Sequence, residues 1–175
     1  MNVHKGIFLI GLAGSGKSTL GKSLANHLGY KFIDLDEVIE KREGLTIPEI
    51  FKKQGAGQFR IMEREALHEV VAVEDTFVLA TGGGTPCFHF NIDAMKENGT
   101  TIYLDVTPGD LALRIIDAGV ESRPMFQSYD HQDLILEIRE MKAMREEYYE
   151  QAEIKIRDNQ ITVDMIVSKL NASKD

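Results

Sequence analysis

The stretch GIFLIGLAGSGKST, residues 6–19, joins a short apolar run to a glycine-rich loop and to the start of a helical pattern. The apolar run at residues 6–10 is typical of a strand that is buried on both faces of a sheet. Leucines then recur at helical spacing over residues 17–28, which predicts an amphipathic helix. A buried strand that passes through glycines into a helix indicates the strand–loop–helix unit of an α/β fold.

The loop itself, residues 11–18, matches the Walker A pattern. Its glycines let consecutive backbone N–H groups point at phosphate oxygens, and the helix N-terminus adds its partial positive charge. We expect Lys17 to bridge the β- and γ-phosphates of ATP and the Ser18 hydroxyl to hold Mg²⁺. A glycine-rich turn with an exposed lysine is the alternative, and the flanking strand and helix argue against it. The predicted ATP-binding residues of the loop are Gly14, Ser15, Gly16, Lys17, Ser18 and Thr19.

The overall composition limits the partners of the chain. It has 175 residues and a formal net charge of −8, which predicts one domain over residues 1–175 that binds neither nucleic acid nor membrane through bulk charge. An anionic ligand then needs a locally basic pocket. The single cysteine, Cys87, excludes an internal disulfide and fits a cytoplasmic location. No apolar run approaches the ~20 residues of a membrane span, and we expect a monomer.

Periodicity along the chain predicts strands that alternate with helices. Strands are expected at residues 6–10, 31–34, 77–80, 101–104 and 154–156. Helices are expected at residues 17–28, 37–42, 46–53, 59–73, 110–116, 134–152 and 161–170, and a loop at residues 118–130. Such alternation indicates a parallel sheet with helices on both faces, and therefore a three-layer α/β domain. Ligands bind such sheets beyond the carboxyl ends of the strands.

Two carboxylates, Asp34 and Asp36, stand at the end of the second predicted strand. In extended geometry, side chains two residues apart face the same side. One carboxylate can then bind Mg²⁺ through water while the other takes the proton of an attacking hydroxyl. Alternatively, Asp34 with Glu37 resembles a helix-capping pair, and Asp36 can itself cap the short helix. The residues alone leave both roles open.

Arg60 and Glu63 lie three residues apart in a predicted helix, where such side chains are neighbours. Glu63 can orient Arg60, whose planar guanidinium suits a carboxylate ligand. An exposed ion pair worth ~0.3–0.5 kcal/mol is the alternative. Phe51 and Phe59 are expected in the core.

Three successive glycines, Gly82, Gly83 and Gly84, follow the third predicted strand. Each gives up ~0.5–1 kcal/mol relative to alanine in regular structure, so something should compensate. A substrate that approaches the bare backbone N–H groups is one explanation, and a sharp turn into residues 85–86 is the other. Arg123 lies in the predicted loop, where a mobile arginine can close over ATP.

Taken together, these positions resemble the shikimate kinase family over nearly the whole chain, from Gly11 to about Ala152. The resemblance rests on the loop GLAGSGKST, FIDLD with Asp34 and Asp36, IPEIF ending at Phe51, FRIME with Arg60 and Glu63, ATGGG ending at Gly84, Arg123-Pro124, and Arg145 with Tyr148 or Tyr149.

The resemblance implies transfer of the γ-phosphoryl group of MgATP to the 3-hydroxyl of shikimate, in the route to aromatic amino acids. It also implies a P-loop kinase fold with a five-stranded parallel sheet in the order 2-3-1-4-5. An acceptor-binding helical insertion at about residues 35–73 and a lid at about residues 118–130 complete the expected architecture.

The resemblance further implies residue roles. Lys17, Asp36 as base, and Arg123 in the lid match catalytic positions, and Arg123 also matches an ATP contact. Ser18, with Asp34 acting through water, matches the metal site. The shikimate-binding positions are matched by Asp36, Arg60, Gly82, Gly83, Gly84 and Arg145, of which the two arginines grip the carboxylate. The length of the lid leaves open the match of Arg114 to an adenine-stacking arginine.

Other interpretations compete with this one. Gluconate kinases usually carry a His-Pro segment after the second strand, and adenylate kinases carry an Asp-Gly-Phe-Pro-Arg type segment. Neither string occurs here. A catalytically silent ATP-binding module is a different class of protein, and the intact set of Lys17, Asp34 and Asp36 argues against it.

Overall fold

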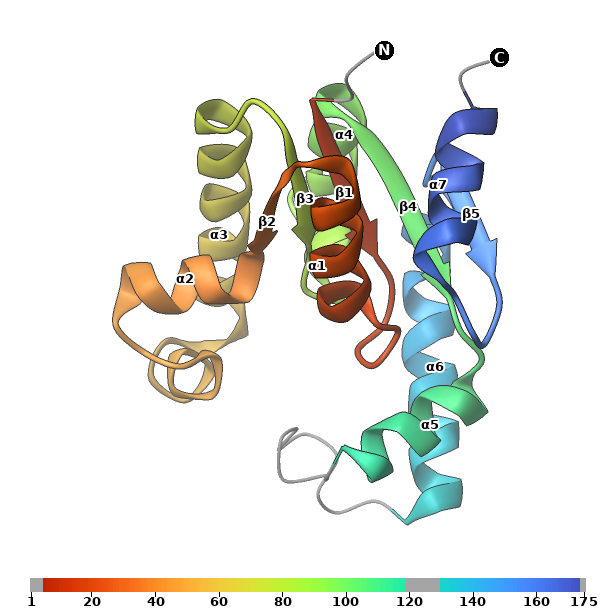
Figure 1. The fold of residues 1–175 in the computed structure, drawn as a ribbon. Coiled ribbons are helices and arrows are strands. Elements are labelled where there is room, and N and C mark those ends of the chain that lie inside the picture. The colour runs from red at the N-terminus through yellow and green to blue at the C-terminus, as the bar shows by residue number, and fades with distance from the viewer. Residues whose placement is uncertain (1–4, 119–129, 174–175) are drawn as a thin grey trace.

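The computed structural model describes residues 5–118 and 130–173. Five parallel strands form one sheet in the order β2-β3-β1-β4-β5 (Figure 1), as the resemblance implied. The strands are β1 (Gly6–Ile10), β2 (Lys31–Asp34), β3 (Phe77–Ala80), β4 (Thr100–Asp105) and β5 (Ile154–Arg157).

Seven α-helices and one short 3₁₀ helix are found in the described part of the chain. They are α1 (Lys17–Leu28), α2 (Leu35–Glu43), α3 (Ile47–Val73), the 3₁₀ helix η1 (Thr85–Cys87), α4 (Asn91–Asn98), α5 (Pro108–Asp117), α6 (His131–Tyr149) and α7 (Val163–Ala172). None of these helices is both long and apolar enough to cross a membrane.

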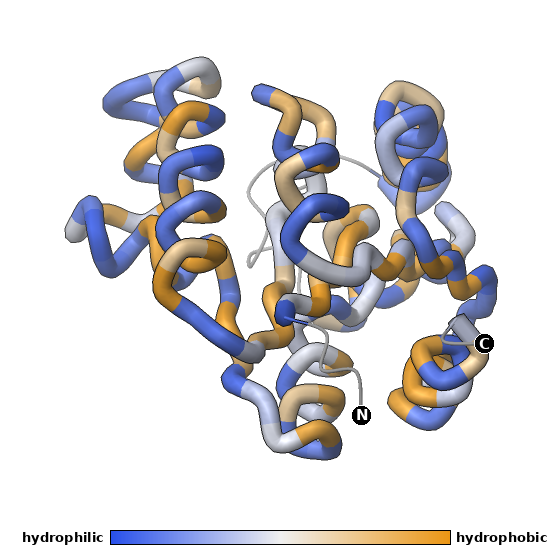
Figure 2. Tube along the Cα trace, turned by 90° about the horizontal axis from the view of Figure 1, so that it is seen from above, coloured by the Kyte–Doolittle hydropathy of each residue, from blue (hydrophilic) through white to orange (hydrophobic). Residues whose placement is uncertain are grey.

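Side chains of β1 alternate between two cores, one on each face of the sheet. Phe8 and Ile10 pack with residues of α3, α4 and α6, whereas Ile7 and Leu9 pack with residues of α1 and α7. In Figure 2 the central strands are largely hydrophobic and the helices around them carry hydrophilic turns. This arrangement confirms the predicted three layers, because a strand buried on both faces needs helices on both sides.

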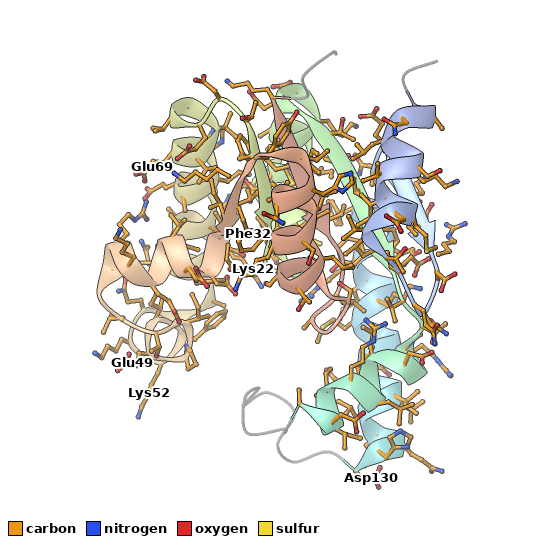
Figure 3. The ribbon with its side chains drawn as sticks, in the orientation of Figure 1. Lys22, Phe32, Glu49, Lys52, Glu69 and Asp130 are labelled. Carbon is orange, nitrogen blue, oxygen red and sulfur yellow. The ribbon has the colours of Figure 1, made fainter. Side chains whose placement is uncertain are left out.

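The ends of the helices follow local capping chemistry. Asp34 caps α2 by accepting a 3.0 Å hydrogen bond from the Asp36 backbone N–H. Thr46 and Glu49 form a reciprocal capping box at the start of α3, and Glu49 is labelled in Figure 3. Helix α3 is interrupted at Gly55, whose φ of 82° and ψ of 169° are not helical. The break predicted between residues 53 and 59 is therefore real.

Two differences from the predicted elements have local causes. Helix α4 was not predicted, because it is short and only Ile92 and Met95 mark its buried side. Helix α6 begins at His131 rather than at residue 134, because the Asp130 side chain caps it by accepting from the Asp133 backbone N–H at 2.8 Å. The whole of α4 and the first turn of α6 lie where apolar residues show little helical periodicity.

The strand register brings three loops to the same edge of the sheet. Asp34 of β2 lies opposite Ala80 of β3, and Ala80 lies opposite Leu9 of β1. The glycine-rich loop, the start of α2 and the glycine run at residues 82–84 therefore leave the sheet at adjacent points. This edge is the carboxyl end of the parallel strands, where ligands of such folds bind.

Candidate active site

A cleft of about 350 Å³ opens at this edge of the sheet. Its lining combines the glycine-rich loop with residues that follow β2 and β3. The polar residues along it are Lys17, Ser18, Thr19, Asp34, Asp36, Thr81 and Arg114, and Ala13, Gly14, Gly16, Gly82, Gly83 and Ala118 complete the lining. The cleft thus joins the predicted nucleotide-binding residues to part of the predicted acceptor-binding set.

The glycine-rich loop has the backbone shape that phosphate binding requires. Gly14 and Gly16 have φ values of 85° and 97°, a left-handed region that favours glycine. Gly16 stands directly before α1, so the N-terminus of that helix faces the cleft. Backbone N–H groups and the helix dipole both favour a bound anion here.

Lys17 is buried within the loop. Its Nζ donates hydrogen bonds to the carbonyl oxygens of Gly11 at 2.7 Å and Leu12 at 2.8 Å, and the residue is only 9% exposed. A lysine on an exposed turn, the alternative considered from the sequence, does not have these contacts. The buried ammonium group supplies positive charge at the floor of the cleft.

Asp34 caps α2 and also contacts Ser18, the other residue of the predicted metal site. One carboxylate oxygen caps α2, and the other accepts a 2.7 Å hydrogen bond from the Ser18 hydroxyl. A serine hydroxyl and a carboxylate in contact form the oxygen-rich donor set that Mg²⁺ prefers. The residues present therefore fit a magnesium ion at this point.

Asp36 is the titratable group of the cleft whose environment is most unusual. Its burial, together with repulsion from Asp34 and Glu63, raises its pKa to about 6, and Lys17 partly opposes the shift. A carboxylate with a raised pKa is a stronger base than an ordinary aspartate. Asp36 is thus suited to accept a proton near neutral pH.

Arg60 and Glu63 form a sheltered ion pair rather than an exposed one. Arg60 Nη1 donates to Glu63 Oε2 at 2.7 Å, and the Glu63 side chain is 1% exposed. The guanidinium group of Arg60 also lies 4.4 Å from the centroid of the Phe88 ring. Arg60 is therefore held in place by Glu63 and by the ring of Phe88.

The three glycines leave room for three charged side chains. A Cβ at Gly82 would lie 2.7 Å from Glu63 Oε1, and one at Gly84 would lie 2.7 Å from both Nη atoms of Arg60. A Cβ at Gly83 would lie 3.0 Å from Arg145 Nη1. Any larger residue would displace an ionic group of the site.

The glycine run also makes the sharp turn that was the second explanation from the sequence. Thr85 N–H donates to the Gly82 carbonyl at 3.1 Å, and Cys87 N–H donates to the Gly84 carbonyl at 3.0 Å. These bonds lead the chain from β3 directly into η1. Turn geometry and room for charged groups together account for three successive glycines.

Arg145 lies on α6 and reaches the glycine run at Gly83, next to the position that Arg60 approaches at Gly84. The next turn of α6 carries Tyr149, whose hydroxyl donates a 2.5 Å hydrogen bond to the Gly83 carbonyl. Burial raises the pKa of Tyr149 above its ordinary value, so the phenol stays a donor. The sequence left Tyr148 or Tyr149 open at this position, and Tyr149 makes the contact.

Arg114 lies beside the glycine-rich loop and lines the cleft. Its Nη1 donates to the Gly14 carbonyl at 3.1 Å, and its Nη2 donates to the carbonyl of Asn159, in the segment that follows β5. Arg114 therefore links the glycine-rich loop to the segment that follows β5, the edge strand of the sheet. Arg123 and the greater part of the predicted lid lie outside the described residues.

Some expectations need correction or addition. Phe51 is 38% exposed, although its ring contacts that of Phe59 at a centroid distance of 4.5 Å, so only Phe59 is a core residue. Thr85 and Asn91 were not singled out from the sequence. They are buried polar residues that contact the site, and the only sequence signal for them is their nearness to the glycine run.

A larger hollow of about 600 Å³ lies between β2, α2 and α3. Among its charged residues, Lys31 pairs with Glu74, and Arg42 pairs with Glu65 outside the lining. On the other face of β2, the ammonium group of Lys22 lies 5.6 Å from the ring centroid of Phe32 (Figure 3). No residue of the glycine-rich loop lines this hollow, so the smaller cleft is the candidate site.

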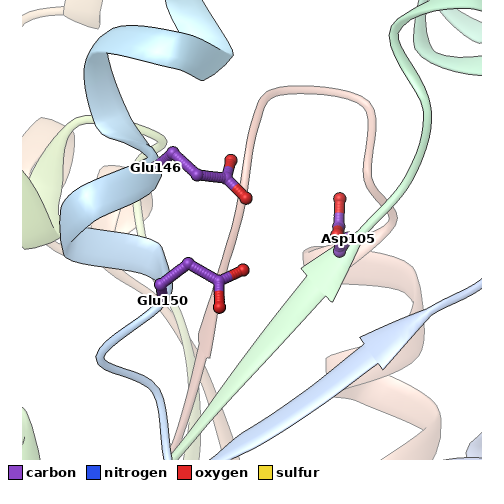
Figure 4. A group of neighbouring side chains, drawn as sticks. All are labelled: Asp105, Glu146 and Glu150. Atoms are coloured by element: carbon purple, nitrogen blue, oxygen red, sulfur yellow. The ribbon is translucent and has the colours of Figure 1, made fainter.

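Asp105, Glu146 and Glu150 bring three carboxylates within 4.8 Å of one another (Figure 4). Lys142 pairs with Asp105 at 2.6 Å, and Arg157 bridges Asp105 and Glu150. Lys155 also pairs with Glu150, at 3.2 Å. The three cations offset the three carboxylates and link the end of α6, the helix that carries Arg145, to β4 and β5.

Comparison with known proteins agrees with the geometry of the cleft. A family model described as shikimate kinase matches residues 13–173. A shikimate kinase of Phocaeicola vulgatus is 39% identical over 173 residues, which cover 94% of this chain and 98% of that protein. A shikimate kinase of Bacteroides fragilis is 44% identical over 146 residues, which cover 83% of this chain and 80% of that protein.

Solved structures agree with this result. A crystal structure of shikimate kinase from Bacteroides thetaiotaomicron matches with a TM-score of 0.88 and 37% identity, over 95% of this chain and 96% of that one. A shikimate kinase from Acinetobacter baumannii in complex with shikimate matches with a TM-score of 0.82 and 32% identity, over 97% and 92% of the two chains. The chain belongs to the shikimate kinase family.

Proposed function

We propose that this protein transfers the γ-phosphoryl group of MgATP to the 3-hydroxyl of shikimate, giving shikimate 3-phosphate and ADP. It is an ATP-dependent kinase that serves the synthesis of aromatic amino acids. The observation that carries the proposal is the convergence of Asp36, Arg60 and Arg145 on the glycine run, beside the glycine-rich loop. A base and two guanidinium groups suit an acceptor that has both a hydroxyl and a carboxylate.

On the acceptor side, Arg60 and Arg145 bind the carboxylate of shikimate. Backbone groups of Gly82, Gly83 and Gly84 line the acceptor position. With the carboxylate held, the ring hydroxyl is directed toward Asp36. Helices α2 and α3, within residues 35–73, form the acceptor-binding part of the fold, and it is the position of α3 that brings Arg60 to the glycine run.

On the nucleotide side, residues 14–19 cradle the phosphates of ATP. Lys17 stabilises the negative charge on the transferring phosphoryl group. Ser18 would hold Mg²⁺ directly and Asp34 would hold it through water, and the ion supplies charge neutralisation for the phosphates. Arg123 acts as the lid arginine that closes over ATP.

The chemical step transfers a phosphoryl group between two oxygens. Asp36 takes the proton of the acceptor hydroxyl, and the oxygen forms a bond to the γ-phosphorus. The bond from that phosphorus to the β–γ bridging oxygen breaks, and ADP leaves with the electron pair. Because burial and neighbouring carboxylates raise the pKa of Asp36 to about 6, the group is ionised at neutral pH and still basic enough to accept the proton.

We also propose that the protein works in the cytoplasm as a monomeric single domain, without nucleic acid or membrane as a partner. The net charge of −8 and the single cysteine support this placement. The positive groups of the site, on Lys17, Arg60 and Arg145, would attract two anionic substrates within an acidic protein.

The decisive experiment measures ADP release with shikimate, gluconate and AMP in parallel, with and without Mg²⁺. We expect turnover with shikimate and Mg²⁺ only, and a ³¹P–¹H coupling that assigns the product phosphate to the 3-hydroxyl. Turnover with gluconate would favour the competing acceptor, since a gluconokinase from Sinorhizobium meliloti shares the fold at 19% identity and a TM-score of 0.60. ADP release that does not depend on any acceptor would contradict the proposal.

A further inference from the structure

Glu63 carries a buried carboxylate that needs a partner for each oxygen. The residue is 0% exposed, and an ionised group removed from water is costly unless it is paired and hydrogen-bonded. Arg60 Nη1 donates to Oε2 at 2.7 Å, which accounts for one oxygen. The other, Oε1, accepts a 2.6 Å hydrogen bond from the Thr85 hydroxyl. Thr85 thus completes the surroundings of the carboxylate that holds Arg60.

Thr85 is itself held from the far side. It is fully buried at the start of η1, and its carbonyl accepts a 2.9 Å hydrogen bond from Asn91 Nδ2, on a side chain that is also fully buried. The same short segment places the ring of Phe88 4.4 Å from the Arg60 guanidinium. One segment therefore contacts both members of the Arg60–Glu63 pair.

We propose that Thr85 is a positioning residue for acceptor binding: its hydroxyl fixes the Glu63 carboxylate, which in turn orients the guanidinium group of Arg60 toward the acceptor carboxylate. This inference rests on the proposed role of Arg60. The Thr85 hydroxyl contacts Glu63, the partner of Arg60, and Thr85 is not among the residues that line the cleft beside the glycine-rich loop, so we expect its effect on the acceptor side.

The geometry explains why a hydroxyl is needed at this position. A Cβ at Gly82 would lie 2.7 Å from Glu63 Oε1 and 3.0 Å from Thr85 Oγ1, so the pair fills the space that the glycine leaves. A valine at position 85 keeps the shape and removes the donor. Glu63 Oε1 would then lose its hydrogen bond, and the carboxylate and its arginine would be free to shift. Misplacement of a binding group by about 1 Å is enough to weaken recognition strongly.

The test compares Thr85→Val, Thr85→Ala and Thr85→Ser in steady-state assays with ATP and shikimate. For Thr85→Val and Thr85→Ala we expect the KM for shikimate to rise roughly tenfold, which is the loss of one hydrogen bond to a charged group. The kcat and the KM for ATP should stay within about twofold, as weakened acceptor binding without a change in the chemical step requires. Thr85→Ser keeps the donor and should restore the parent KM.

The matched control is Thr101→Val. Thr101 is also fully buried and its hydroxyl accepts a 3.0 Å hydrogen bond from the Glu153 backbone N–H, on β4 and away from the cleft. This variant should change stability without changing the KM for shikimate. A second comparison places Thr85→Val in an Arg60→Ala background, where it should add nothing because the residue it positions is gone.

Several results would overturn the inference. These are an unchanged KM in Thr85→Val, an equal defect in Thr85→Ser, or additive effects of Thr85→Val and Arg60→Ala. Failure of both Thr85→Val and Thr85→Ala to fold would also overturn it, since the hydroxyl would then serve the fold. If Arg60→Ala itself leaves the KM for shikimate unchanged, the proposed role of Arg60 fails instead, which separates the two outcomes.

Discussion

The Ser18 hydroxyl donates a 2.7 Å hydrogen bond to Asp34 Oδ2, and this contact joins the glycine-rich loop to the beginning of α2. The other oxygen of Asp34 accepts from the Asp36 backbone N–H. One carboxylate therefore connects the glycine-rich loop with Asp36, the proposed base. Its observed helix capping and its proposed role in metal binding can be separated by substitution.

We expect Asp34→Asn to raise the Mg²⁺ concentration that half-maximal activity requires, by roughly tenfold, because a neutral amide is a weaker partner for the ion. Asparagine is as good a helix N-cap as aspartate, so the melting temperature should not change. Asp34→Ala should show the same Mg²⁺ defect and lose ~1 kcal/mol of stability in addition. A normal Mg²⁺ titration of Asp34→Asn would leave Asp34 with capping alone.

We expect Lys17→Ala to lower kcat by at least ~100-fold, because the ammonium group stabilises charge on the transferring phosphoryl group. The circular dichroism spectrum should stay that of a folded protein. The control is Lys22→Ala, which removes an exposed lysine from the same helix. An unchanged kcat in Lys17→Ala would remove the phosphate-binding assignment of the loop.

We expect Arg60→Ala to raise the KM for shikimate by roughly 10- to 100-fold, since hydrogen bonds to charged groups contribute ~1.5–3 kcal/mol. The KM for ATP should stay close to that of the parent protein. Arg64 is an exposed arginine one turn further along α3, so Arg64→Ala is the matched control. An effect confined to ATP would assign Arg60 to the wrong substrate.

The raised pKa of Asp36 predicts the acid limb of the pH profile. A general base must be ionised, and the pKa of Asp36 is about 6. The value of kcat/KM for shikimate should therefore be constant above that pH and fall about tenfold per unit below it. Asp36→Asn should lower kcat by ~10²–10⁴ and abolish this limb. Full activity of Asp36→Asn would show that another group takes the proton.

The raised pKa of Asp36 favours activity above pH 6 but lowers the stability of the folded protein there. Because the folded pKa of Asp36 lies above the unfolded value, the native state binds more protons between about pH 4 and 6, and stability decreases as pH rises through that range. Asp36→Asn removes this cost, so the variant should be more stable than the parent at pH 7, by up to ~3 kcal/mol for a pKa raised from 3.8 to about 6.

Urea unfolding at pH 7 and at pH 4 measures that difference, and the gain should vanish at the lower pH. Asp75→Asn, at an exposed aspartate, is the control and should have no such pH-dependent gain. If Asp36→Asn is no more stable than the parent at pH 7, the ionised Asp36 side chain does not destabilise the folded protein.

The nucleotide half of the site was predictable because it is continuous in sequence. Residues 6–19 contain the strand, the loop and the first helix turn, so motif and context occur together. The sheet order came from the family resemblance, and the alternation of strands and helices predicted the layers. Helix α4 escaped prediction because a short helix with two buried apolar residues has no clear period.

The acceptor half was only partly predictable from single residues. The buried state of Glu63 depends on Thr85, which is 22 residues away in sequence, and no local pattern marks that contact. The glycine run was noticed, but its reason, the space needed by Glu63, Arg145 and Arg60, lies in tertiary contacts. The sequence left the role of Asp34 open; its carboxylate caps α2 and contacts Ser18, and its part in metal binding stays a prediction.

The wide spacing of the residues that meet at Gly82, Gly83 and Gly84 has a consequence for synthesis on the ribosome. A nascent chain that has emerged only through α5 already contains the phosphate-binding loop and four of the five strands. It still lacks Arg145, which α6 supplies. Under the proposed roles, the acceptor site is therefore assembled only after α6 has been added, whereas the nucleotide loop is present from the first strand onward.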